Sequence, residues 1–138
     1  MRFSQKIYRF PLRRNHYNDY EVLRSLRRSI LEGLSYLDRR GYLHRDLKPE
    51  NIMLKNREAV ETQNIKICDF GLATRVDIKD YIFKRCGTPG YVAPEIVKAD
   101  ANNPNFRSTS KCDVFSAGVI LHLLLSKIVL TKSWRYSI

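Results

Sequence analysis

The sequence predicts a mainly α-helical fold with one small β-hairpin, and three patterns indicate this fold class. Apolar residues recur at helical spacing across residues 18–41, which predicts an amphipathic helix of about six turns. A stretch that is apolar on nearly every helical face, at about 110–126, predicts a second helix buried in a core. The short β-type runs Ile52–Leu54 and Ile65–Cys68 lie between the two and predict the hairpin.

Composition and charge are those of an ordinary globular domain or of a piece of one. The chain has 138 residues, of which 43% are hydrophobic and 28% charged, and its formal net charge is +11. Residues 1–45 hold 11 basic and 4 acidic residues, which raises the hypothesis of a basic fragment that binds nucleic acid. The arginines fall mostly on the solvated face of the first predicted helix and no nucleic-acid-binding motif accompanies them, so no specific nucleic-acid partner is predicted.

The cysteines and the apolar runs bear on the setting of the protein. Cys68, Cys86 and Cys112 form no Cys-x-x-Cys pair, which argues against a disulfide framework or a zinc site and favours a reducing, intracellular setting such as the cytoplasm. The longest apolar stretch, Val114–Leu125, is too short to cross a bilayer. No membrane span is therefore predicted.

The first helix follows a segment without a regular pattern. Residues 1–17 are basic and aromatic with no sustained hydrophobic period, and we interpret them as a loosely held arm. Asn18 and Glu21 resemble a capping box at the start of the helix, and Gly41 suits its end. The core face of this helix is predicted to carry Val22, Leu23, Leu26, Ile30, Leu31, Leu34 and Leu37.

The run His44–Asn51 places three groups suited to phosphoryl transfer on one tight turn. Asp46 can accept a proton from an incoming hydroxyl, and Lys48 can neutralise charge on a transferring phosphoryl group. Asn51 can offer its amide oxygen to Mg²⁺, while Pro49 stiffens the loop between them. We predict that the chemistry of the protein takes place at this turn.

This run resembles the catalytic loop of eukaryotic protein kinases, and Lys48, two places after Asp46, resembles the serine/threonine branch. Asp69-Phe70-Gly71, which follows the second β-type run, resembles the family's metal-binding motif. The resemblance implies ATP and Mg²⁺ as cofactors, with Asn51 and Asp69 as metal ligands and Lys48 at the nucleotide phosphates.

The resemblance also assigns supporting roles around the loop. It implies that Phe70 packs inward against His44 and that Gly71 adopts a backbone angle that other residues resist. Asp113, near the start of the second predicted helix, would hydrogen-bond the backbone near His44 and Arg45. That contact would fix the strained shape of the loop.

A second motif, Gly87–Glu95, resembles the family's substrate-docking loop. The resemblance implies that the hydroxyl of Thr88 hydrogen-bonds Asp46 and Lys48. It also implies that Glu95 pairs with an arginine from a later part of a complete kinase domain. The residues that would lie against the protein substrate are Gly87, Pro89 and Gly90.

Two interpretations of Glu50 stay open. The likeness of the docking loop is greatest to the calcium/calmodulin-dependent and related basophilic kinases. In such a kinase Glu50 would contact an arginine upstream of the serine or threonine that is phosphorylated in a protein substrate. The alternative is a solvated carboxylate on the surface of the loop.

The resemblance divides the chain into a basic N-terminal arm at 1–17, a partial protein kinase domain at 18–127 and a divergent C-terminal tail at 128–138. Within the domain, the catalytic loop spans 44–51 and the activation segment 69–95. The glycines form no glycine-rich flap, and no strand lysine precedes the catalytic loop, so we expect the N-terminal lobe to be absent. The fold class that follows is a partial protein-kinase C-terminal, helical lobe.

Two function hypotheses of different kinds follow. The first is a serine/threonine protein kinase fragment that transfers the γ-phosphoryl group of ATP to protein hydroxyls, with Asp46 as the base. We expect the isolated chain to be incomplete and inactive, because the missing lobe would position the phosphates. The rival hypothesis is a truncated, catalytically inactive kinase-like lobe that acts as a binding module. Coding sequence on either side of the chain would discriminate between the two.

Overall fold

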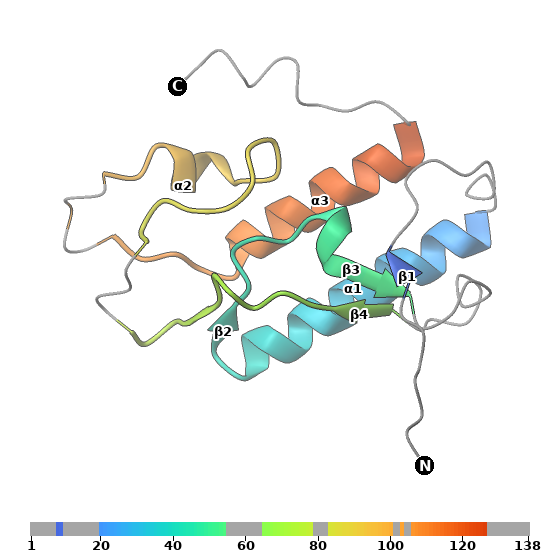
Figure 1. Cartoon of the computed structure of the whole chain (residues 1–138), viewed down its shortest axis with the longest axis horizontal. Helices are drawn as coiled ribbons and strands as arrows, with labels where there is room; N and C mark the ends of the chain where they lie inside the picture. The colour runs from blue at the N-terminus through green and yellow to red at the C-terminus, as the bar shows by residue number, and fades with distance from the viewer. Residues whose placement is uncertain are drawn as a thin grey trace.

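The computed structural model describes residues 8–9, 20–54, 65–78, 83–100, 103 and 106–126. This part of the chain is helix-rich, with two small sheets beside two long helices (Figure 1). No helix in it is long and apolar enough to cross a membrane. In chain order the elements are β1 (Tyr8–Arg9), α1 (Tyr20–Arg39), β2 (Tyr42–Leu43), the 3₁₀ helix η2 (Pro49–Asn51), β3 (Ile52–Leu54), β4 (Ile65–Ile67), β5 (Thr74–Arg75), α2 (Pro94–Val97) and α3 (Lys111–Ser126).

Helix α1 confirms the first predicted helix and the way it ends. It runs to Arg39, and Gly41 follows with a φ of 71°, donating its N–H to the Asp38 carbonyl oxygen at 2.9 Å. Glycine suits this position because a left-handed backbone is costly for a residue with a Cβ atom. The predicted cap, Asn18, lies outside the described residues.

One face of α1 is buried, as the apolar spacing predicts, with one exception. The described side chains that reach the core are Leu23, Leu26, Ile30, Leu34 and Leu37. The side chain of Val22 lies outside the described part. Leu31 is 42% exposed, so its predicted place on the core face is wrong. It lies about 100° around the helix from Ile30, which carries it off the buried face.

Strands β3 and β4 form the predicted hairpin. They pair antiparallel with Ile52 opposite Ile67, and β1 adds a third strand along the other edge of β3. Strand β1 lies inside residues 1–17, so the interpretation of that whole segment as a loosely held arm is wrong for these two residues. A strand of two residues is too short to show an alternating pattern.

A second sheet, of two strands, was not predicted. Leu43 of β2 lies opposite Thr74 of β5, and Val76 donates its N–H to the Gly41 carbonyl oxygen at 2.9 Å. These contacts hold the first part of the predicted activation segment against the turn that follows α1. The sheet therefore fixes the chain directly before the catalytic loop.

Helix α3 confirms the second predicted helix but not its complete burial. It runs antiparallel to α1 and packs against it, and the two helices enclose the core together with β3 (Figure 1). Val114 and Leu125 are 52% and 70% exposed, so the prediction of a helix buried on nearly every face is wrong on this side. Apolar composition alone does not tell which residues are covered, because much of a folded surface is apolar.

The core reaches the predicted catalytic loop directly. Its buried cluster comprises Leu26, Ile30, Leu34, Leu47, Ile52, Ala117, Ile120 and Leu124. Leu47 lies within the loop, between Asp46 and Lys48, and Ile52 lies directly after the loop. Burying one such side chain contributes about 1.5–3 kcal/mol, so the loop is anchored where its functional groups are.

Two glycines give a matched test of this fold. Gly41→Ala is expected to lower the free energy of unfolding by about 1 kcal/mol, because alanine resists the left-handed backbone. In the control, Gly118→Ala, the added Cβ meets nothing within 4 Å inside α3. That variant should gain about 0.5–1 kcal/mol, because alanine favours a helix over glycine. Urea unfolding measures both changes, and shifts of the same sign would contradict the expectation.

Candidate active site

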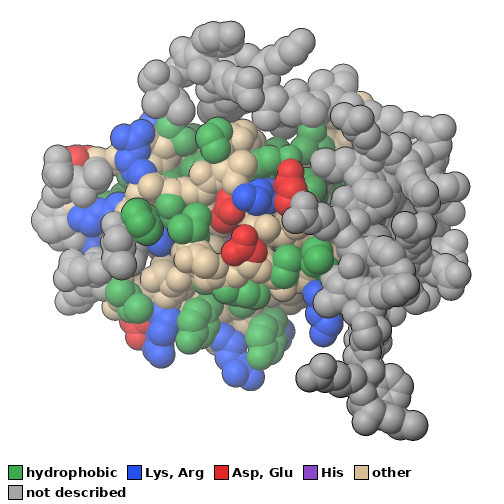
Figure 2. Space-filling view, viewed as in Figure 1, with side chains coloured by type: hydrophobic (Ala, Val, Ile, Leu, Met, Phe, Trp, Pro, Cys, Tyr) green, Lys and Arg blue, Asp and Glu red, His purple; other side chains and the backbone are tan. Residues whose placement is uncertain are grey.

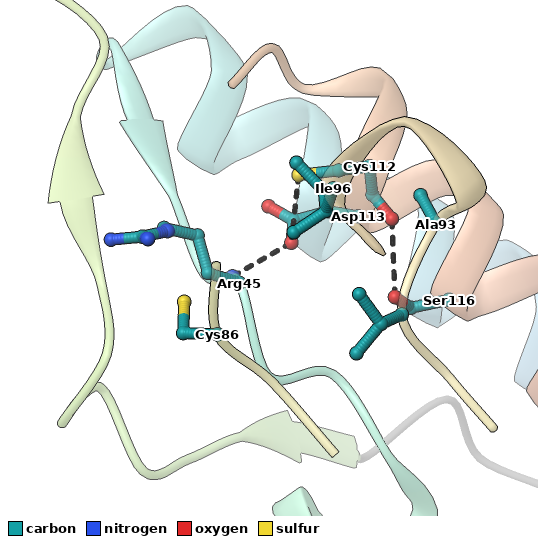
Figure 3. Close-up of a pocket in the computed structure, with 8 residues that line it drawn as sticks. Arg45, Cys86, Ala93, Ile96, Cys112, Asp113 and Ser116 are labelled. Carbon is teal, nitrogen blue, oxygen red and sulfur yellow. Dashed lines mark hydrogen bonds between the residues drawn. The ribbon is translucent and has the colours of Figure 1, made fainter. Parts of the chain in front are cut away.

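The predicted catalytic loop is held by one carboxylate of α3. Asp113 is 3% exposed and accepts the backbone N–H of His44 at 2.7 Å through Oδ2 and that of Arg45 at 2.8 Å through Oδ1. Figure 3 shows the Arg45 contact. These are the hydrogen bonds that the sequence predicts for Asp113. They join a core helix to a loop nearly seventy residues earlier in the chain.

The hydrogen bonds hold the loop in a costly conformation. Arg45 has a φ of 69°, in the left-handed region, which costs a residue other than glycine about 1–2 kcal/mol. Burial raises the pKa of Asp113, and the hydrogen bonds from the His44 and Arg45 amides offset part of that effect. The surrounding contacts must therefore stabilise both a strained residue and a buried acid.

Asp46, Lys48 and Thr88 form a triangle at the centre of the site. The Lys48 ammonium donates to Asp46 Oδ2 at 2.8 Å and to Thr88 Oγ1 at 2.8 Å. The Thr88 hydroxyl in turn donates to Asp46 Oδ1 at 2.6 Å. The predicted contacts of Thr88 are thus present, and they bring the docking loop onto the catalytic loop.

The same contacts keep the Asp46 carboxyl ionised. Burial acts to raise the pKa of Asp46, but the hydrogen bonds from Lys48 and Thr88, together with the charge of Lys48, outweigh it and lower that pKa below its ordinary value. Asp46 is therefore a carboxylate at neutral pH. A carboxylate at this position can accept a proton from a neighbouring hydroxyl.

Asn51 is oriented by Asp46. Its amide nitrogen donates to the Asp46 carbonyl oxygen at 2.9 Å and lies 3.4 Å from Asp46 Oδ2, and the residue is 4% exposed. Because the amide is planar, engaging its nitrogen turns its oxygen away from Asp46. That oxygen has the chemistry that Mg²⁺ prefers.

Cys68 connects the catalytic loop to Asp69. The Cys68 N–H donates to the Asn51 carbonyl oxygen at 2.9 Å, and the Cys68 carbonyl oxygen lies 3.0 Å from His44 Nε2. His44 Nδ1 accepts the N–H of Asp46 at 3.3 Å, which assigns the imidazole proton to Nε2. Asp69 follows directly, so the hairpin brings the Asn51 and Asp69 backbones close together, as the sequence predicts.

Two details of the Asp69-Phe70-Gly71 motif differ from the prediction. The left-handed backbone lies at Asp69, with a φ of 62°, and not at Gly71, so the expected special angle of Gly71 is wrong. A Cβ on Gly71 would instead come within 3.2 Å of Asp69 Oδ1, which the Gly71 N–H approaches at 3.3 Å. Phe70 contacts His44 edge-on, with ring centroids 5.1 Å apart. Phe70 is nevertheless 48% exposed, so its expected inward packing is only partial.

The docking loop needs glycine at two points. Gly87 has a φ of 112°, and a Cβ there would lie 2.8 Å from the Arg45 carbonyl oxygen, so the two loops approach at a distance that only glycine permits. Gly90 also has a positive φ, of 91°. Pro89 is exposed, and so is Glu95, in the first turn of α2.

Glu50 lies on the solvent side of the loop. It is exposed in the 3₁₀ helix η2. Burial raises the pKa of Tyr91 in the docking loop, and the negative charge of Glu50 adds to that effect, which indicates that the two groups are near each other. Figure 2 shows a small central group of acidic and basic side chains on one face of the molecule, with hydrophobic side chains on both sides of it.

The oxygen donors present suit Mg²⁺ better than a softer metal. No group of three His, Cys, Asp or Glu side chains that could hold a metal ion occurs among the described residues. Mg²⁺ is commonly held by one or two protein oxygens, with waters and phosphates completing its shell. The amide oxygen of Asn51 and the exposed carboxylate of Asp69 fit that requirement.

One hydrogen bond at the site is not predicted from the sequence. The Ser116 hydroxyl in α3 donates to the Tyr91 carbonyl oxygen of the docking loop at 2.7 Å. A serine within the apolar stretch Val114–Leu125 is the available signal, because a buried hydroxyl requires a hydrogen-bond partner. The apolar pattern of the helix does not indicate which group the Ser116 hydroxyl bonds.

The contact of Asp113 is open to a direct test. In Asp113→Asn the amide oxygen can still accept one of the two backbone N–H groups, but the amide NH₂, itself a donor, then faces the other N–H. The free energy of unfolding should therefore fall by about 1–3 kcal/mol. Asp38→Asn, on the exposed end of α1, is the matched control and should change it by less than about 0.5 kcal/mol. Urea unfolding at neutral pH makes the comparison. Equal stability of the two variants would mean that the carboxylate does not hold the loop.

Known proteins resemble this chain over most of its length. It is 39% identical over 102 residues to the probable serine/threonine-protein kinase fhkE of Dictyostelium discoideum, covering 74% of this chain and 14% of that protein. It is 39% identical over 103 residues to the mouse phosphorylase b kinase gamma catalytic chain, liver/testis isoform, covering 75% of this chain and 24% of that protein. It is 37% identical over 122 residues to MAP kinase-interacting serine/threonine-protein kinase 2 of Xenopus laevis, covering 83% of this chain and 25% of that protein. The chain thus spans a quarter or less of the length of these relatives.

The family comparison agrees with the geometry of the loop. The model of the protein kinase domain matches residues 4–135. The match takes in the catalytic loop, the Asp69-Phe70-Gly71 motif, the docking loop and α3. The chain therefore belongs to the protein kinase domain family.

Proposed function

We propose that this chain is part of the C-terminal, helical lobe of a serine/threonine protein kinase and carries residues that transfer the γ-phosphoryl group of ATP to a protein hydroxyl. The observation that carries the proposal is the Thr88 hydroxyl, 2.6 Å from Asp46 Oδ1 and 2.8 Å from Lys48 Nζ. An alcohol oxygen thus already lies between an ionised acceptor and a cation. A substrate hydroxyl needs the same two neighbours for this reaction.

Each residue of the site has a proposed role. Asp46 takes the proton of the attacking hydroxyl, and Lys48 neutralises the charge of the transferring phosphoryl group. Asn51 and Asp69 would hold Mg²⁺. When bound, Mg·ATP supplies the phosphoryl group and its metal. Thr88, in the docking loop, hydrogen-bonds both Asp46 and Lys48 and so holds their side chains in position relative to each other.

The proposed domain organisation keeps residues 18–127 as the kinase part, 1–17 as an arm of which β1 joins the sheet, and 128–138 as a tail, and the family match over 4–135 extends into both the arm and the tail. The packing of α3 behind the catalytic loop supports placing this part in a helical lobe. Positioning the phosphates is most of the catalysis in phosphoryl transfer. A second lobe with a flap and a strand lysine would supply that positioning.

We propose protein substrates with a basic residue upstream of the target serine or threonine. Support comes from Glu50, an exposed carboxylate whose negative charge helps to raise the pKa of Tyr91 in the docking loop. A substrate running along that loop would pass close to Glu50, and an arginine can bind a carboxylate through two parallel hydrogen bonds.

The role of Asp46 can be tested in the natural protein that contains this chain. Asp46→Asn is expected to lower the kcat for peptide phosphorylation by about 10²–10⁴-fold, because an amide cannot accept the proton. Asp38→Asn removes the same charge from α1 and should retain full activity. A wild-type protein that binds kinase substrates without turnover would favour the binding-module hypothesis, and undiminished turnover by Asp46→Asn would reject this base.

The preference for basic substrates has its own test. Glu50→Ala should reduce the ratio of kcat/KM values for peptides with and without an upstream arginine by about tenfold, the loss expected for one exposed charge-assisted contact. Asp38→Ala should leave that ratio unchanged. A ratio that stays the same in both variants would identify Glu50 as a solvated loop carboxylate.

A further inference from the structure

The first two turns of α3 contact both loops of the site. Asp113 holds the catalytic loop, and Ser116, three residues later, holds the docking loop through Tyr91. Ser116 is 6% exposed, and its hydroxyl lies 2.7 Å from the Tyr91 carbonyl oxygen and 3.1 Å from the Cys112 carbonyl oxygen of its own helix. Figure 3 shows the contact with Cys112. A hydroxyl has one proton, so the shorter contact, to Tyr91, is the favoured one.

A short series of contacts connects Ser116 to the proposed base. The Tyr91 N–H donates to the Thr88 carbonyl oxygen at 3.1 Å, which closes a turn. The Thr88 hydroxyl at the start of that turn donates to Asp46 Oδ1. Moving Tyr91 away from α3 would therefore move the hydroxyl that touches Asp46.

Ser126, in the last turn of α3, shows a close contact between a serine hydroxyl and its own helix. Its hydroxyl donates to the His122 carbonyl oxygen, four residues back in the helix, at 2.7 Å. The equivalent contact of Ser116, to Cys112, is longer, at 3.1 Å. Contact within the helix is thus the weaker of the two contacts that Ser116 makes.

We propose that Ser116 is a positioning residue for phosphoryl transfer. Its hydroxyl fixes the docking loop on α3 and so sets where Thr88 and a protein substrate lie relative to Asp46. The kinetic part of this inference rests on the proposed function, whereas the contact itself can be measured without turnover.

Amide hydrogen exchange of the full chain tests the contact. Ser116→Ala should speed exchange of the Tyr91 amide by about tenfold, the effect of losing one hydrogen bond that closes the loop. The His44 and Arg45 amides, which Asp113 holds, should change by less than about twofold, because the loss is local. Ser35→Ala is the matched control: it removes an exposed hydroxyl from the interior of α1 and gains a similar helix propensity.

Peptide kinetics in the natural protein test the function. Ser116→Ala should raise the KM for a peptide substrate by about tenfold and leave the KM for ATP within about twofold, because the hydroxyl acts on the substrate side. Ser116→Thr retains the hydroxyl and should restore both the peptide KM and the slow Tyr91 exchange.

The outcomes separate this inference from the proposed function. Unchanged Tyr91 exchange in Ser116→Ala, or equal acceleration at His44 and Arg45, would overturn the positioning role. An unchanged peptide KM in a protein whose Tyr91 amide exchanges faster would overturn it as well. If the wild-type protein transfers no phosphate, the proposed function fails by itself, and the exchange data still decide whether Ser116 fixes the loop.

Discussion

A single buried carboxylate, that of Asp113, is the constraint on which the site depends. It belongs to a helix that packs in the core, and it accepts two backbone amides from the part of the loop that precedes η2 and has no regular structure of its own. One of those amides belongs to Arg45, whose backbone is left-handed. A loop of irregular shape can be as rigid as the core when its polar groups are satisfied by a core element.

In the proposed mechanism, the substrate side and the metal side of the site meet at Asp46. Lys48 and Thr88 hydrogen-bond its carboxylate, and Asn51 hydrogen-bonds its backbone carbonyl and lies near the same carboxylate. These contacts keep Asp46 ionised but also make it a weaker base, because each donor stabilises the charged form. A weak base suits phosphoryl transfer, in which positioning and charge stabilisation contribute more than proton removal.

The sequence predicts the chemical groups of this site better than the way in which they are supported. The contacts among Asp46, Lys48 and Thr88 could be expected because short, contiguous motifs carry those residues. Periodicity predicts α1 and α3, but it cannot tell that Leu31 or Val114 faces outward, since exposure depends on which elements pack nearby. The pairing of β2 with β5, and the hydroxyl contact of Ser116, join segments far apart in the chain. No local pattern encodes such a partner.

Exposure divides the site into supporting and ligand-facing groups. His44 and Asp113 are 0% and 3% exposed, and each makes hydrogen bonds within the protein. Asp69 and Glu50, the proposed metal and substrate contacts, are exposed. Asn51 is 4% exposed and belongs to both sets, because its amide nitrogen bonds Asp46 while its oxygen is the proposed Mg²⁺ ligand. Phe70, half-exposed but in contact with His44, marks the boundary between the two sets.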